Sequence, residues 1–69
     1  MQKIKKVLVV EDDLSLWPMW EVILHRCLPS AQIEWAVSAE EARRMVREAS
    51  QNQKPFAVII SDLFLAGSG

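Results

Sequence analysis

The 69-residue sequence predicts an α/β fold, in which strands and helices alternate along the chain. Three short runs of β-branched and other apolar residues are separated by two segments whose apolar residues recur at helical spacing. The connections between these segments are short, which favours right-handed crossovers and a parallel sheet with helices on its faces. The predicted element order is therefore strand, helix, strand, helix, strand, within a single domain.

The first predicted strand covers about residues 5–11 and contains a continuous apolar run from Val7 to Val10. Such a run is typical of a strand that is buried on both faces, as in the middle of a parallel sheet. A helix is expected next, over about residues 15–28, because its apolar residues share one face. Pro18 is compatible with this helix if Ser15 caps it, since first-turn N–H groups have no intrahelical partner.

The second half of the chain repeats the pattern. A strand is expected over about residues 32–37, and its polar character favours an edge position. A strongly amphipathic helix should follow over about residues 39–50, because Ser38 and Glu41 have the spacing of a capping box. The apolar run over about residues 56–61 predicts the third strand.

Composition narrows the class of protein. Half of the residues are apolar, a quarter are charged and the net charge is −1, which fits a globular chain and gives no sign of nucleic-acid binding. Cys27 is the only cysteine, so no internal disulfide can form, and we expect a reducing, cytoplasmic location. No apolar stretch approaches the roughly 20 residues of a membrane span. We therefore expect neither nucleic acid nor membrane as a partner.

Carboxylates follow two of the predicted strands. Glu11, Asp12 and Asp13 come after the first strand, and Asp62 comes after the third. Parallel sheets bind ligands beyond the carboxyl ends of their strands, and clustered carboxylates there would repel one another unless a cation joined them. Mg²⁺ suits such a site because it takes few carboxylates and accepts phosphate oxygens. A solvated strand end is the simpler alternative, and Asp13 could instead cap the first helix.

The motifs Val-Val-Glu-Asp-Asp at 9–13 and Ile-Ile-Ser-Asp-Leu at 59–63 resemble the receiver domain of response regulators in two-component signalling. The resemblance covers residues 1–69 and corresponds to the N-terminal half of that domain. It implies a truncated flavodoxin-like fold, with a three-stranded parallel sheet in the order 2-1-3.

The resemblance also assigns roles to individual residues. Glu11 and Asp12 match the acidic pair of the family's metal site, and Asp62 matches the phosphoacceptor, which is also a metal ligand. The backbone carbonyl of Phe64 matches a further metal ligand. The implied reaction is phosphoryl transfer to Asp62, with Mg²⁺ bound, from a sensor histidine kinase or a phosphotransfer protein.

The sequence departs from the family in one important respect. The family's two further strands supply a lysine and a hydroxyl group near the phosphoryl oxygens, and no corresponding strands follow Asp62 here. Lys3, Lys5, Lys6 and Lys54 all precede strands, so we expect them at the opposite end of the sheet. Phosphorylation should therefore be slow or absent.

A second hypothesis is that the chain is a phosphorylation-incompetent half-domain that associates with itself. The apolar run 56–60 contains neither charge nor proline, so nothing discourages its edge from recruiting another strand. The predicted first helix is apolar almost all round. These features predict a homo-oligomer, such as a dimer, through the third strand and the first helix. No enzyme motif is present, so we do not expect a true enzyme.

Overall fold

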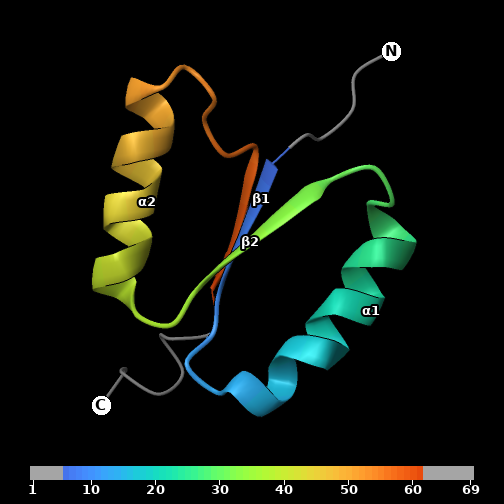
Figure 1. Ribbon diagram of the computed structural model, residues 1–69. Coiled ribbons are helices and arrows are strands. Elements are labelled where there is room, and N and C mark those ends of the chain that lie inside the picture. Colours follow the sequence, from blue (N-terminus) through green and yellow to red (C-terminus); the bar gives the residue numbers. More distant parts are fainter. Residues whose placement is uncertain (1–5, 62–69) are drawn as a thin grey trace.

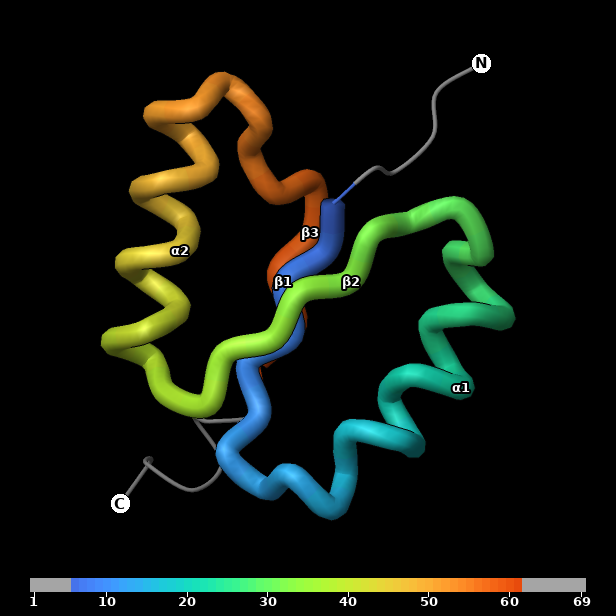
Figure 2. Tube along the Cα trace, in the orientation of Figure 1, coloured from blue at the N-terminus to red at the C-terminus, as the bar shows by residue number. Residues whose placement is uncertain are grey.

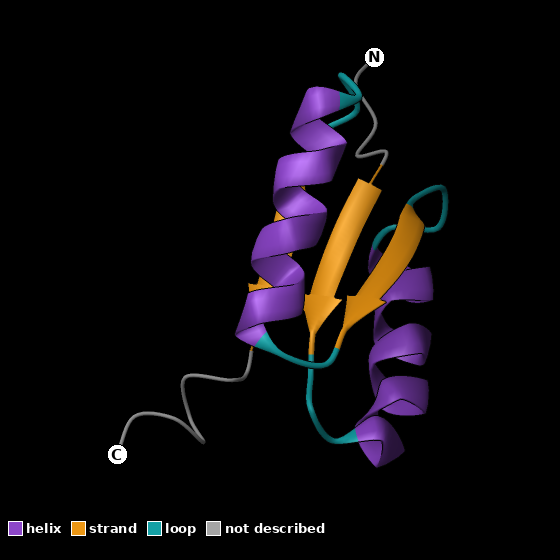
Figure 3. Ribbon diagram, turned by 60° about the vertical axis from the view of Figure 1, so that its left-hand side comes forward, coloured by secondary structure: helices purple, strands orange, loops and turns teal. Residues whose placement is uncertain are grey.

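The computed structural model describes residues 6–61 of the chain (Figure 1). Its elements, in chain order, are β1 (Lys6–Val10), the 3-10 helix η1 (Leu14–Leu16), α1 (Trp17–Cys27), β2 (Gln32–Ala36), α2 (Ala39–Gln51) and β3 (Val58–Ser61). Helices α1 and α2 lie on opposite sides of the sheet, as Figures 1 and 3 show from two directions. The structure thus confirms the predicted α/β class and its element order.

The three strands form one parallel sheet in the order β2-β1-β3. Strand β1 lies in the middle, and Val10 is the register partner of both Ala36 in β2 and Ser61 in β3. The four residues from Val7 to Val10 are at most 3% exposed. The predicted burial of the first strand on both faces, and the edge position of the second within this sheet, are confirmed.

Alternate residues of β1 build two separate cores. Leu8 and Val10 point to the α2 side, where Ala42 is the buried helical contact. Val7 and Val9 point to the α1 side, where Leu24 is buried. This division follows from the period of two along a strand, which sends successive side chains to opposite faces. One apolar run therefore holds both helices on the sheet.

The first helical segment begins differently from the expectation. Asp13, not Ser15, caps it: Asp13 Oδ1 accepts hydrogen bonds from Ser15 N at 3.0 Å and from Ser15 Oγ at 2.6 Å. The capped turn is the 3-10 helix η1, and α1 follows it from Trp17 with Pro18 in its first turn. The position of Pro18 agrees with the absence of an intrahelical partner for a first-turn N–H group.

Backbone groups at both ends of α2 that lack intrahelical partners form hydrogen bonds with neighbouring residues of the chain. Ser38 Oγ accepts from Glu41 N at 3.1 Å, as the capping-box spacing predicts, but Glu41 Oε1 accepts from Val37 N at 2.8 Å, one residue before the cap, and not from the N–H of Ser38. At the other end, Gln53 N donates to Ser50 O and Lys54 N donates to Ala49 O. These two bonds are those of a Schellman motif. The chain turns back toward β3 at that point.

Lys6 makes the contacts that join the three strands at the amino end of the sheet. Its Nζ donates to Lys54 O at 3.0 Å, lies 3.8 Å from Glu34 Oε2 and sits 4.5 Å from the centre of the Phe56 ring. The segment before β3 is thereby joined to β1 and β2. Although the third strand was expected from about residue 56, β3 begins at Val58. Within residues 6–61, neither helix is long and apolar enough to cross a membrane.

Candidate functional site

The acidic segment after β1 lies at the carboxyl end of the sheet. The loops that follow β1 and β2 leave this same end (Figure 2). Strand β3 reaches it as well, because its last residue, Ser61, is the register partner of Val10. Glu11 is the next residue after Val10 and is held on the sheet by its N–H group, which donates to Ala36 O at 2.9 Å.

Glu11 is the most tightly held of the three acidic residues. It is only 3% exposed, although its side chain is a carboxylate. Oε1 accepts a hydrogen bond from Trp20 Nε1 at 3.1 Å, and Oε2 accepts one from Asp13 N at 3.1 Å. The main-chain oxygen of Glu11 accepts a third bond, from Trp17 Nε1 at 3.1 Å. Each of the three oxygens of Glu11 therefore accepts a hydrogen bond.

These contacts explain how a carboxylate can be buried at a strand end. Removing a charged group from water is costly unless hydrogen bonds replace the lost hydration. Trp20 and the backbone of Asp13 supply such bonds to Glu11 from two different directions. A carboxylate has about four lone-pair positions, so two donors leave acceptor capacity on both oxygens. Glu11 can therefore contribute to a cation site while remaining fixed.

Asp12 and Asp13 have different environments. Asp12 is exposed, and its carboxylate makes no hydrogen bond or ion pair with any other residue in the 6–61 segment. Asp13 is exposed too, but its Oδ1 is engaged by Ser15. The capping role that the sequence left open for Asp13 is thus confirmed. Of this pair, Asp12 has the carboxylate that is available to a ligand.

The predicted site is only partly covered by the structure. Glu11 and Asp12 are adjacent at the end of β1, whereas Asp62 and Phe64 lie outside the described residues. Among residues 6–61 there is no group of three or more His, Cys, Asp or Glu side chains that could hold a metal ion. The carboxylates of Glu11 and Asp12 have the hard oxygen donors that suit Mg²⁺. A complete site with the predicted ligands requires Asp62.

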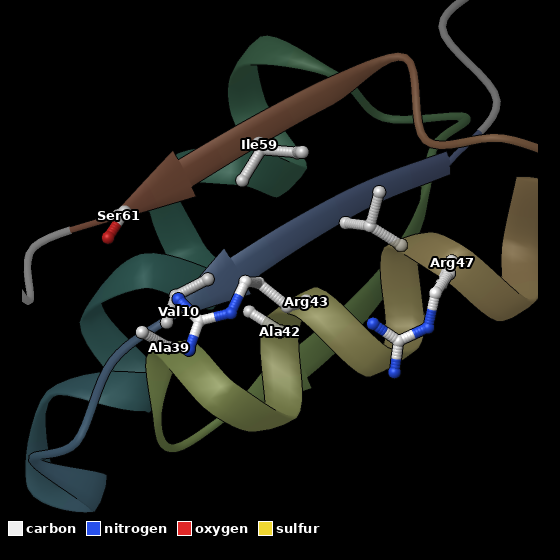
Figure 4. A pocket seen from close by; sticks show the side chains of 8 residues that line it. Val10, Ala39, Ala42, Arg43, Arg47, Ile59 and Ser61 are labelled. Carbon is white, nitrogen blue, oxygen red and sulfur yellow. The ribbon is translucent and has the colours of Figure 1, made fainter.

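An open cavity of about 430 Å³ lies between α2 and β3, next to this end of the sheet. Figure 4 shows Val10 and Ser61 at the strand ends, and Arg43 and Arg47 on the helix. Its lining is mostly apolar, and Ile59 contributes a side chain that is about half exposed. Arg43 lies beside Val10 at the strand end, whereas Arg47 lies one turn further along α2, away from the strand ends.

The lysines of the described segment lie away from the acidic residues. Lys6 is the first residue of β1, and its Nζ is bonded to the carbonyl of Lys54, so both are at the amino end of the sheet. This is where the sequence placed them. Lys3 and Lys5 lie outside the described residues. Neither Lys6 nor Lys54 can reach a group bound near Glu11, at the far end of the strand.

Sequence reasoning gave neither Trp17 nor Trp20 a role as a hydrogen-bond donor in this site. Trp17 and Trp20 both donate to Glu11, and the Trp17 ring stacks on Trp35 in β2. A signal was available, because buried indole N–H groups usually find an acceptor and these two residues follow directly after an acidic segment. Their spacing of one turn, on a helix beginning beside Glu11, would bring both within reach of it.

The order β2-β1-β3, the parallel pairing and the placement of α1 and α2 on opposite faces are compatible with a flavodoxin-like fold. Comparison of the chain with models of protein families, with curated proteins and with solved structures found no match.

Proposed function

We propose that the chain is the N-terminal half of a receiver domain and that Asp62 accepts a phosphoryl group. The observation that supports this most is the pairing of Val10 with Ser61 on adjacent parallel strands. Glu11 follows the first of these residues in the sequence and Asp62 follows the second. Acidic residues that follow neighbouring strands at one end of a parallel sheet belong to the region where such sheets bind ligands.

The proposed donor is a phosphohistidine of a sensor histidine kinase or a phosphotransfer protein. An oxygen of the Asp62 carboxylate attacks phosphorus, the new O–P bond forms, and the P–N bond to the imidazole breaks. The imidazole nitrogen keeps the electron pair of the broken bond. The products are an aspartyl phosphate and a histidine without its phosphoryl group.

Glu11, Asp12, Asp62 and the carbonyl of Phe64 are the proposed ligands of Mg²⁺ in this reaction. When bound, Mg²⁺ would neutralise part of the charge that gathers on the phosphoryl oxygens. Glu11 contributes a carboxylate whose orientation is already fixed by its hydrogen bonds. Asp12 contributes one that has no competing partner in the described segment. The donor set is thus chemically suited to a hard cation.

Phosphorylation is tested by incubating the chain with phosphoramidate and Mg²⁺ and measuring its intact mass. We expect a slow gain of one phosphoryl group, which is lost in Asp62→Asn and when Mg²⁺ is removed by a chelator. Asp13→Asn is the matched control, because an amide oxygen can still cap η1 and the proposal gives Asp13 no chemical role. Absence of labelling in the unmutated chain, or equal labelling in Asp62→Asn, would refute the proposal.

A second candidate function is self-association, favoured by the apolar side chains that remain exposed. Ile59 in β3 is 51% exposed. On α1, Met19, Val22 and Ile23 are between 42% and 59% exposed and share one side of the helix. Within the described sheet, β3 is an edge strand that pairs with β1. Antiparallel pairing of β3 between two copies would form a two-fold homodimer with both α1 helices on one face.

A further inference from the structure

We infer that Trp20 is a positioning residue whose indole N–H fixes the carboxylate of Glu11 and thereby makes the site selective for Mg²⁺ over Ca²⁺. This inference rests on the proposed function, because it concerns the same metal site. It is carried by the hydrogen bond from Trp20 Nε1 to Glu11 Oε1, at 3.1 Å, on a carboxylate that is 3% exposed.

The carboxylate of Glu11 is held at both oxygens. Trp20 donates to Oε1, and the backbone N–H of Asp13 donates to Oε2. A carboxylate that accepts a hydrogen bond at one oxygen only could still rotate about its last side-chain bond, because this χ3 angle of glutamate has a broad distribution. Two donors on different oxygens remove that freedom. The orientation of the group is therefore set before any cation arrives.

The donor is itself fixed by packing. Trp20 packs against the core cluster formed by Val7, Val9 and Leu24. Three residues earlier, Trp17 anchors the start of the same helix by its hydrogen bond to the carbonyl of Glu11. The indole N–H of Trp20 is thus held by the fold rather than by the ligand. Trp20 would act on the cation only through Glu11.

A fixed carboxylate favours the smaller cation. Mg²⁺ requires nearly ideal octahedral geometry and usually takes one oxygen from each carboxylate, whereas Ca²⁺ accepts variable geometry and bidentate carboxylates. The hydrogen bonds from Trp20 and Asp13 fix the orientation of the Glu11 carboxylate, so a rotation that turned both oxygens toward one cation would have to break them. Loss of the Trp20 donor would release Oε1 and allow the group to turn. Selectivity should then shift toward Ca²⁺.

The test compares Mg²⁺ and Ca²⁺ affinities by calorimetric titration of the full chain and two variants. In Trp20→Phe, which keeps an aromatic ring but lacks the N–H, we expect about a 10-fold loss of Mg²⁺ affinity with a smaller change for Ca²⁺. Trp17→Phe is the matched control. It also loses one indole N–H to Glu11, but from the main-chain oxygen, so the ratio of the two affinities should remain that of the unmutated chain.

The outcomes separate the inference from the proposed function. If Trp20→Phe keeps the original ratio of Mg²⁺ to Ca²⁺ affinity, the inference is wrong and the metal site stands. If the unmutated chain binds no Mg²⁺, both are wrong. If circular dichroism shows that Trp20→Phe does not fold, a second measurement on the unmutated chain replaces it. The indole N–H signal of Trp20 in a ¹⁵N–¹H spectrum is then followed as Mg²⁺ is added. We expect the signal to shift, and an unchanged signal overturns the inference.

Discussion

The indole rings of Trp17 and Trp35 are stacked, with their centres 4.8 Å apart and their planes at 23°. Trp17 is the first residue of α1 and Trp35 lies in β2, so the pair joins the start of the helix to an edge strand. The same Trp17 ring donates its N–H to the carbonyl of Glu11. One side chain therefore links the helix, the edge strand and the acidic end of the central strand.

Breaking this stack should lower the free energy of unfolding more than the loss of apolar area explains. Trp17→Leu and Trp35→Leu each remove one ring, and the double variant removes both. Because stacked aromatic pairs contribute about 0.5 to 1.5 kcal/mol beyond area burial, the double-mutant cycle should give a coupling energy in that range. Urea denaturation measures it. A coupling energy near zero would show that the stacked contact contributes no stability beyond the burial of each ring by itself.

Removal of the Asp13 carboxylate should destabilise the fold through the lost cap. Asp13→Ala should reduce the free energy of unfolding by about 1 kcal/mol, whereas Asp13→Asn should retain most of it. Asp12→Ala is the neighbouring control. Its carboxylate is exposed and lacks partners in the described segment, so a change within about 0.5 kcal/mol is expected in thermal or urea denaturation. Equal losses at the two positions would contradict the capping assignment.

Gln53→Gly should stabilise the chain. Gln53 occupies the left-handed position of the Schellman motif after α2, with φ of 61°. A side chain there costs about 1 kcal/mol relative to glycine, which adopts this conformation freely. The midpoint of thermal unfolding should therefore rise. Asn52→Gly is the control, because Asn52 has φ of −87° and its replacement should give no gain.

Self-association should depend on the exposed apolar side chain of β3. Ile59→Lys places a charge on a half-exposed residue of this edge strand without entering the α1-facing core, so light scattering at micromolar concentration should show a shift toward monomer. Val37→Lys makes the same change beyond the other edge strand, at a residue that is 42% exposed. It should leave the molecular mass unchanged. A monomeric unmutated chain would exclude this candidate function.

Phosphorylation of the chain should be slow, because the lysines of the described segment are far from the acidic residues. Since Lys6 and Lys54 lie at the amino end of the sheet, neither can stabilise the charge on a phosphoryl group near Asp12. Loss of one such stabilising donor typically lowers a rate by about 10² to 10³. Under the proposed function, time-resolved mass measurement should therefore give labelling that is slower by that factor than in a receiver domain with such a donor near its phosphoacceptor. Comparable rates would mean that another cationic group takes part.

Most of the fold could be predicted because its signals are local. The apolar run of β1 and the Ser38 cap of α2 depend on neighbouring residues only, and both were confirmed. The cap of the first helical segment was left open between Ser15 and Asp13, because both are good capping residues, and the structure has Asp13 in this position. The start of β3 was misplaced because Phe56 is apolar whether it pairs in a strand or packs beside one.

The candidate site could be predicted only in part. Carboxylates after β1 are visible in the sequence, but which of them is buried depends on donors brought by the fold. Glu11 is buried because Trp20 reaches it from α1, while Asp12 has no such donor in the described segment and is exposed. Asp62 and Phe64 lie outside the described residues, so their assignments remain predictions.

The central position of β1 also governs the order in which the protein can assemble during translation. Leu8 leaves the ribosome before both of its register partners, Glu34 and Ile59, which lie in later parts of the chain. Pairings between residues so distant in sequence form slowly, because the intervening chain must first lose conformational entropy. Among the described strands, the most deeply buried one is therefore synthesised first and cannot pair until β2 and β3 have followed. Its pairing with β3 can be completed only after almost the whole described segment has been synthesised.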